Sequence, residues 1–243
     1  MMQTAPGGGG MHALLDLVFP PRCAGCDRPG SLLCDACAAE VRRIDPRAAC
    51  VRCGAPVARP SGCAECRGRT FAFDSAYAAT LLEHPVSRAV VLLKDGGERR
   101  YAGLLAGLLA ERADGWVDPS CAIVPVPASP AAVRRRGFDH AVDLALTLGE
   151  LRGMPTIRLL ESSPVADQRS LGRQERFANR AGAFRLARPR GWEREAEVPA
   201  RVVLVDDVLT TGATLDAAAR VLRAAGVVEV RALVVARAMR ADA

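Results

Sequence analysis

The sequence predicts an α/β fold, with a doubly wound and mostly parallel sheet that follows a small cysteine-rich unit. Short apolar runs rich in β-branched residues alternate with longer runs that suit helices, which is typical of a parallel sheet with helices on both faces. Eight of the nine cysteines lie before residue 67. The 243 residues, 50% of them hydrophobic, suffice for one full-sized core and a small second unit.

We divide the chain into a lead-in over residues 1–20, a cysteine-rich unit over 21–70 and an α/β domain over 71–240. Proline suits the first turn of a helix, so His84-Pro85 predicts a helix start. Cys121 lies in an expected strand, so we expect a buried thiol. In chain order we expect a strand at 71–82, helices from 84 and at 101–113, a strand at 121–126, a helix at 137–151, strands at 156–160 and 202–205, a helix at 215–225 and a strand at 228–236.

The most informative segment is residues 202–214, with the sequence VVLVDDVLTTGAT. Four apolar residues predict a buried strand, and Asp206 and Asp207 follow it. A loop of Thr210, Thr211, Gly212, Ala213 and Thr214 then leads into a helix. The start of a helix presents unpaired N–H groups and the positive end of its dipole, which suits a phosphate. Two carboxylates beside it can accept hydrogen bonds from a vicinal diol, so the segment predicts a site for a phosphorylated sugar.

Two other interpretations of this segment exist. A threonine-rich strand-to-helix joint can be an ordinary helix cap. An apolar strand ending in acids also resembles the Walker-B strand of a nucleoside triphosphatase, but that class needs a G-x-x-x-x-G-K-[ST] loop upstream, which this sequence lacks. The strand and the acid pair together favour the sugar phosphate.

Lys94 is the only lysine in the chain, and it precedes Asp95, Gly96 and Gly97 where an apolar helix breaks into a glycine turn. Arginine is otherwise the cation of this sequence. A single lysine at a tight turn therefore indicates a need for a compact ammonium group, although a chance surface lysine is the alternative.

The cysteines form four CxxC pairs separated by seven, twelve and nine residues. A CxxC turn directs two thiolates at one tetrahedral ion, so four such turns predict two structural zinc sites. Disulfides are the alternative, but we expect a cytoplasmic chain, which keeps its thiols reduced. Pairing of neighbouring turns is the simplest arrangement, and interleaved pairing stays open. The expected ligands are Cys23, Cys26, Cys34, Cys37, Cys50, Cys53, Cys63 and Cys66.

The net charge of +6 and a pI near 9.0 favour acidic partners, either phosphorylated small molecules or nucleic acid. With 4% aromatic residues, a base-stacking platform for single strands is disfavoured. No run approaches the roughly 20 apolar residues of a membrane span. A second basic cluster, residues 134–136, is expected at a helix start, and His12, His84 and His140 are expected to be structural or exposed.

Residues 202–214 resemble the signature of the type I phosphoribosyltransferases, which bind 5-phosphoribosyl 1-pyrophosphate (PRPP) with Mg²⁺. The resemblance implies that Asp206 and Asp207 contact the ribose hydroxyls, that residues 210–214 wrap the 5′-phosphate, and that the turn of residues 94–97 binds pyrophosphate. The polar stretch at 162–180 is long for a connection, which is typical of a lid. Its arginines could close over pyrophosphate or reach nucleic acid, with a solvated linker as the alternative; they are Arg169, Arg173 and Arg176.

With the cysteine array, the VPVP strand and the RRRGFDHA and QRSLGRQERFANR segments, the chain is similar over about residues 13–237 to the ComF family of competence-associated, phosphoribosyltransferase-like proteins with an N-terminal double zinc ribbon. Where that family usually has RGFNQ, residues 136–140 are RGFDH. One hypothesis is an enzyme that transfers phosphoribosyl from Mg-PRPP to an acceptor. The others are a PRPP-sensing protein associated with single-stranded DNA, and an adaptor for a helicase-like partner.

Overall fold

The computed structural model describes residues 20–57, 63–163, 182–187 and 198–239. Its centre is a four-stranded parallel sheet in the order β1-β6-β5-β2, in which β1 is Ser75–Leu81, β6 Glu229–Arg237, β5 Arg201–Leu209 and β2 Ala122–Pro125. A two-stranded antiparallel sheet pairs β3 (Leu160–Ser162) with β4 (Phe184–Leu186). The predicted α/β fold with a mostly parallel sheet is confirmed.

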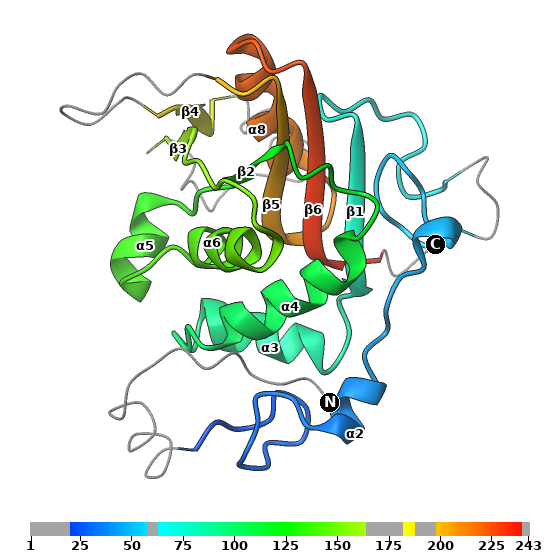
Figure 1. Cartoon of the computed structure of the whole chain (residues 1–243), viewed down its shortest axis with the longest axis vertical. Coiled ribbons are helices and arrows are strands. Elements are labelled where there is room, and N and C mark those ends of the chain that lie inside the picture. The colour runs from blue at the N-terminus through cyan, green and yellow to red at the C-terminus, as the bar shows by residue number, and fades with distance from the viewer. Residues whose placement is uncertain (1–19, 58–62, 164–181, 188–197, 240–243) are drawn as a thin grey trace.

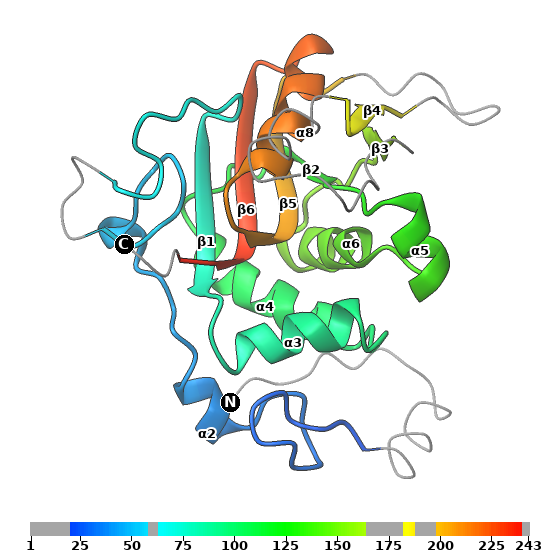
Figure 2. The ribbon, with the colours of Figure 1, turned by 180° about the vertical axis from the view of Figure 1, so that it is seen from behind.

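Helices cover both faces of the sheet (Figure 1). On one face lie α3 (Val86–Lys94), α4 (Tyr101–Ala113) and α6 (His140–Arg152), and α5 (Pro130–Arg136) lies at the end of this layer. The view from behind shows α8 (Ala213–Ala224) on the opposite face (Figure 2). The short helices α2 (Asp35–Ala39) and η1 (Pro46–Ala48) belong to the cysteine-rich segment.

Side chains of residues 202–205 in β5 alternate between the two faces of the sheet, and each face has its own core. Val203 and Val205 pack with α4 and α6, whereas Val202 and Leu204 pack with α8. Because successive residues of a strand point to opposite faces, Asp207 continues the series that faces α4 and α6. The strand itself extends through both acids to Leu209, so the prediction that it ends before them was wrong. The added length is explained by pairing, since Asp206 lies opposite Val234 of β6.

Other predicted boundaries shift for identifiable reasons. The first strand begins at Ser75, after Phe71 and Phe73, whose rings stack on each other. The strand expected at 156–160 is wrong: Thr156 makes only an isolated bridge to Ile123, and β3 starts at Leu160. The strand β4 was not predicted.

The helix expected at 137–151 is preceded by a helix, α5, that was not predicted from the sequence. Ser129 caps α5 by accepting from the N–H of Ala132, and Gly137 closes it with a φ of +82°. Asp139 then caps α6 through the N–H groups of Ala141 and Val142. The basic cluster at 134–136 is therefore at the end of a helix, where positive charge suits the helix dipole, and not at a helix start. The helix at 101–113 is confirmed.

The cysteine-rich segment is attached to the sheet. Residues 42–44 run antiparallel along the outer edge of β1, with hydrogen bonds from Ile44 N–H to Ala79 O and from Leu81 N–H to Arg42 O. This pairing covers an edge strand that would otherwise be open to other chains. Cys121 is buried as expected. In the described part of the chain, no helix has the length and apolar character required to cross a membrane.

Candidate functional site

The site is centred on an ion pair between Lys94 and Asp207. Lys94 is the last residue of α3, and its Nζ lies 2.5 Å from Oδ2 of Asp207, whose side chain is 2% exposed. The lysine therefore reaches the signature acids, although more than a hundred residues separate them in the sequence. A buried carboxylate requires such a partner, because an unpaired charge in the interior costs several kcal/mol.

The turn after Lys94 has the shape that its glycines predict. The N–H groups of Asp95 and Gly96 both donate to Val91 O, which closes the helix. A Cβ on Gly96 would lie 2.7 Å from Leu92 O, and Gly97 has a φ of +70°. Neither position accepts an ordinary side chain without strain, so the tight approach of this turn to the site depends on both glycines.

Asp206 is destabilised in its charged form. Burial raises the pKa of its carboxyl well above the usual range, the adjacent Asp207 carboxylate adds to the rise, and Lys94 acts in the opposite direction. Its Oδ1 accepts a hydrogen bond from the N–H of Asp207 at 2.9 Å. Two carboxylates with one ammonium leave excess acceptor capacity, which hydroxyl donors of a ligand can satisfy.

His140 also lies beside Asp207, and it is buried, so the alternative that it is exposed is wrong. The residue is 6% exposed at the first position of α6, and its Nε2 lies 3.5 Å from Oδ2 of Asp207. Burial lowers the pKa of His140, although the Asp207 carboxylate acts in the opposite direction. Arg136 Nη1 lies 3.2 Å from His140 Nδ1. Because a guanidinium can only donate, Nδ1 must accept, and the ring proton is then on Nε2 and directed at Asp207.

Arg136 extends this network to the glycine turn, since its Nη2 lies 3.4 Å from Oδ1 of Asp95. The network thus joins the turn after α3, the end of α5, the start of α6 and the acid on β5. The signal in the sequence was the RGFDH segment, whose last residue is His140. Its proximity to residue 207 could not be read from spacing along the chain.

The threonine loop lies at the carboxyl end of β5, as expected. Thr210 and Thr211 are exposed, and Gly212 has a φ of +82° where it begins α8. The N–H of Ala213 donates to Thr211 Oγ1 at 3.4 Å, and Thr214 lies in the first turn of the helix. The loop thus presents hydroxyls and a helix N-terminus to one side, which is an arrangement suited to an anion.

The eight cysteines form two separate clusters, each from two neighbouring CxxC turns. Within each cluster the sulfur atoms lie within 4.8 Å of one another. Measured spacings are 3.7 Å for Cys23–Cys34 and for Cys50–Cys66, and 3.5 Å for Cys53–Cys63. A tetrahedral zinc with bonds of about 2.3 Å places its sulfurs about 3.8 Å apart, so both clusters fit zinc. The adjacent pairing is therefore the one the structure has, and the interleaved alternative is wrong.

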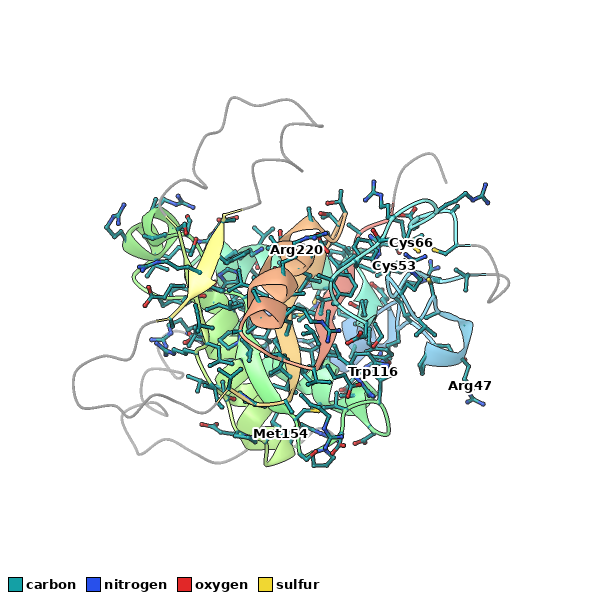
Figure 3. The ribbon with its side chains drawn as sticks, turned by 90° about the horizontal axis from the view of Figure 1, so that it is seen from above. Arg47, Cys53, Cys66, Trp116, Met154 and Arg220 are labelled. Carbon is teal, nitrogen blue, oxygen red and sulfur yellow. The ribbon has the colours of Figure 1, made fainter. Side chains whose placement is uncertain are left out.

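We call Cys23, Cys26, Cys34 and Cys37 the first knuckle, and Cys50, Cys53, Cys63 and Cys66 the second knuckle. Figure 3 shows Cys53 and Cys66 of the second knuckle next to each other. In the first knuckle, the N–H groups of Gly25 and Cys34 point at the sulfur of Cys23 at 3.4 Å. Although burial raises the pKa of Cys23, these N–H groups lower it to about 6, which favours the thiolate that zinc binds.

Of the expected lid at 162–180, residues 164–180, including Arg169, Arg173 and Arg176, lie outside the described residues, and Ser162 ends β3. Of the remaining predicted positions, Asp206 to Thr214 lie at the carboxyl end of β5, and Lys94, at the start of the glycine turn, contacts them through Asp207. Ligands bind at such ends in α/β sheets.

Comparison with known proteins agrees with this architecture. The double zinc ribbon domain family matches residues 14–67, and the phosphoribosyl transferase domain family matches residues 196–242. The chain is thus a phosphoribosyltransferase-like α/β protein with an N-terminal double zinc ribbon.

Relatives place it further. The chain is 32% identical over 225 residues to the DNA utilization protein YhgH of Salmonella typhimurium, covering 85% of this chain and 92% of that protein. Competence protein F of Haemophilus influenzae is 36% identical over 120 residues, covering 48% of this chain and 50% of the relative. Competence protein ComFC of Streptococcus pneumoniae is 29% identical over 108 residues, covering 44% of each. The chain belongs to the ComF family.

Proposed function

We propose that the protein binds PRPP with Mg²⁺ and transfers its phosphoribosyl group to an acceptor, in a process linked to DNA uptake. The observation that carries the proposal is the 2.5 Å contact between Lys94 and Asp207. It joins the single lysine of the glycine turn to the acid pair, so one site has groups for a diol and groups for an anion. The match to the phosphoribosyl transferase domain family and the names of the relatives support it.

Each part of PRPP has a complementary group. The carboxylates of Asp206 and Asp207 accept hydrogen bonds from the ribose 2′ and 3′ hydroxyls. The N–H groups and hydroxyls of residues 210–214 hold the 5′-phosphate. Lys94 exchanges part of its contact with Asp207 for the oxygens of the pyrophosphate, beside the turn formed by Asp95, Gly96 and Gly97.

The acceptor displaces pyrophosphate from C1 of the ribose. The C1–O bond to pyrophosphate breaks as the bond to the acceptor forms, and the leaving group departs with its electron pair. The transition state resembles an oxocarbenium ion, so the protein contributes positioning and charge stabilisation and no covalent nucleophile. Lys94 stabilises the negative charge on the departing pyrophosphate, while the Asp206 and Asp207 carboxylates stabilise positive charge on the ribose.

The residues present fit a magnesium ion in part. Asp206, Asp207 and His140 offer ligand atoms within 4.8 Å of one another, but Mg²⁺ prefers oxygen, so the two carboxylates are the groups that would hold it. When bound with PRPP, Mg²⁺ offsets the charge of the pyrophosphate. The predicted lid arginines, Arg169, Arg173 and Arg176, would add further cations to the same end of the ligand.

Calorimetric titration with PRPP and Mg²⁺ tests this function. The wild-type protein should bind, and Asp207→Asn should weaken binding at least tenfold because one diol acceptor and the partner of Lys94 are altered together. Asp118→Asn is the matched control: its carboxylate pairs with Arg201 at the opposite end of β5. Absence of binding by the wild type, or equal binding by Asp207→Asn, would overturn the proposal.

Turnover is tested separately, by release of pyrophosphate from PRPP in the presence of candidate acceptors. Binding without release would favour a second function, PRPP sensing by a protein associated with single-stranded DNA. Arg134 and Arg135 favour it, because they are exposed cations in the last turn of α5. DNA affinity should then fall steeply with salt and weaken in Arg134→Gln/Arg135→Gln. This second function also includes a cytoplasmic location and a helicase-like partner.

A further inference from the structure

We propose that the second knuckle is part of the phosphate site, and that Arg237 and Arg69 are positioning residues that orient the loop of residues 209–212. This inference rests on the proposed function, since it concerns the loop assigned to the 5′-phosphate. The second knuckle then has a role in ligand binding, and the first knuckle does not.

Arg237 ends β6 and is 2% exposed. Its Nη1 donates to Thr210 O at 2.7 Å and to Leu209 O at 3.1 Å. The opposite side of the same guanidinium belongs to the cysteine-rich segment. Nε donates to Cys53 O at 3.2 Å, and Nη2 donates to Glu65 Oε2 at 3.0 Å. One buried side chain therefore connects the second knuckle to the predicted phosphate loop.

Both charges in this connection are almost completely removed from water. The side chains of Arg237 and Glu65 are 2% and 4% exposed. Glu65 lies between Cys63 and Cys66 in the CxxC turn, so its position is fixed by the turn that holds the metal. Removal of either partner leaves an uncompensated buried charge, and loss of metal from the knuckle would release Glu65.

Arg69 makes the next contact along the loop. Its Nη1 donates to Thr211 O at 3.0 Å. Three successive carbonyls, those of residues 209, 210 and 211, thus accept from two arginines. Phe71 packs nearby, since a Cβ on Gly212 would lie 3.0 Å from its ring. Cys53, Glu65, Arg69 and Phe71 therefore support the loop together, through Arg237 and through direct contacts.

Peptide geometry gives this support a consequence for binding. A trans peptide unit is planar, and its N–H points opposite to its C=O. When Arg237 and Arg69 hold the carbonyls of Thr210 and Thr211, the N–H groups of Thr211 and Gly212 are directed to the other side of the loop. In the described part of the chain no acceptor contacts these two N–H groups. They are unpaired donors at the start of α8, which suits a phosphate.

The experiment measures two ligands with each variant: ribose 5-phosphate, which probes the loop, and inorganic pyrophosphate, which probes the turn at Lys94. Arg69→Gln should weaken ribose 5-phosphate binding about tenfold, and Arg237→Lys should weaken it further, because the single nitrogen of a lysine cannot reach all the acceptors that Arg237 contacts with three nitrogens. Pyrophosphate affinity should change less than twofold. Arg201→Gln is the matched control, since it removes the same charge at the opposite end of β5.

If Arg237→Lys does not fold, Arg69→Gln still decides the question, because its side chain is only partly buried. Unchanged ribose 5-phosphate affinity in Arg69→Gln, or an equal loss for both ligands, would overturn the inference. Failure of the wild type to bind either ligand would overturn the proposed function instead. In that case amide exchange at Thr211 and Gly212 still tests the support: faster exchange in Arg69→Gln than in Arg201→Gln agrees with it, and equal rates contradict it.

Discussion

The first and the second knuckle have the same four ligands and different neighbours. The first knuckle contacts the start of α3 and the helix α4: Arg88 Nη2 donates to Asp27 Oδ1 at 2.7 Å, His84 Nε2 lies 3.0 Å from Gly25 O, and Tyr101 Oη donates to Arg22 O at 2.6 Å. His84 and Arg88 lie at the end of α3 away from Lys94, and Tyr101 is the first residue of α4. The first knuckle therefore packs against the helices α3 and α4, at a distance from the acid pair.

The second knuckle instead packs against β1 and the loop after β5. Ala76 N–H donates to Val51 O at 2.9 Å, and Arg237 joins Cys53 and Glu65 to the loop. On our proposal, one metal site of the chain is purely structural and the other also supports a ligand site. What decides the difference is the identity of the elements that each knuckle contacts, and not the metal chemistry.

Removal of both zinc ions is expected to have the largest effect. Each structural zinc contributes about 10–16 kcal/mol to folding, and residues 20–57 add few apolar side chains to replace it. Chelation should therefore release two zinc ions per chain and lower the melting temperature sharply, because the edge of β1 loses its cover. Circular dichroism melts and a zinc assay check this. A melting temperature that stays the same after metal release would contradict a structural role.

A pair of glycine variants separates the knuckles without changing a ligand. A Cβ at Gly25 would lie 2.4 Å from the sulfur of Cys37, so Gly25→Ala should displace this ligand and reduce the zinc content to about one per chain. A Cβ at Gly54 would lie 3.1 Å from Ala78 N, and its φ is +68°. Gly54→Ala should retain both zinc ions and cost about 1–3 kcal/mol.

Zinc content and urea unfolding, measured on the same samples, distinguish these outcomes. Two zinc ions in Gly25→Ala, or one in Gly54→Ala, would show that the two glycines do not differ as their contacts predict.

Lys94 ends α3, which contacts the first knuckle. Asp206 lies on β5, and the loop after β5 contacts the second knuckle. The acid pair and its lysine therefore lie between the elements that the two knuckles contact. The raised pKa of Asp206 means that the folded state holds its proton more tightly than the unfolded state. Stability from this group is therefore present below the ordinary aspartate pKa of about 3.9 and is lost as pH rises through the folded value. Asp206→Asn removes this loss of stability at higher pH, because the side chain no longer ionises.

At neutral pH we expect Asp206→Asn to be about 1 kcal/mol more stable than wild type, which corresponds to roughly 2–4 °C in melting temperature, while PRPP binding weakens. The difference in stability should shrink as the pH is lowered towards 4. Melting curves at several pH values test this, with Asp118→Asn as the control. A variant that is less stable than wild type at neutral pH would contradict the burial argument.

The smallest effect is expected from Arg88→Gln, which cuts the ion pair between the first knuckle and α3. Arg88 and Asp27 are 39% and 47% exposed, so solvent screens the pair and it contributes little to stability. Affinity for ribose 5-phosphate should not change. Denaturant unfolding and calorimetry check both statements, and a tenfold loss of affinity would mean that the first knuckle also acts on the site.

The sequence alone predicted the elements whose pattern is local. The strand of residues 202–205, the glycine turn after Lys94 and the four CxxC turns are each encoded by residues close together in the chain. Their positions in the structure agree with those expectations. The helix α5 was missed because it is only seven residues long and rich in arginine. Its start is marked by one capping residue, Ser129, directly before Pro130.

The contacts that define the site could not be predicted in this way, because they join distant segments. Nothing near His140 in the sequence indicates that it faces Asp207, and nothing near Arg237 indicates that it reaches Glu65. Such contacts depend on the order of the strands and on which face of β5 each residue occupies. Most residues of the site could be predicted from the sequence, whereas their contacts are determined by tertiary packing.

The central claim is that the second knuckle supports the phosphate loop and the first does not. The most direct measurement is ribose 5-phosphate affinity in Cys26→Ser and Cys53→Ser, with zinc content determined on the same samples. Each variant should retain about one zinc ion. Cys26→Ser should bind with affinity within about threefold of wild type, and Cys53→Ser should lose at least about tenfold. Equal affinity in the two variants would contradict the claim.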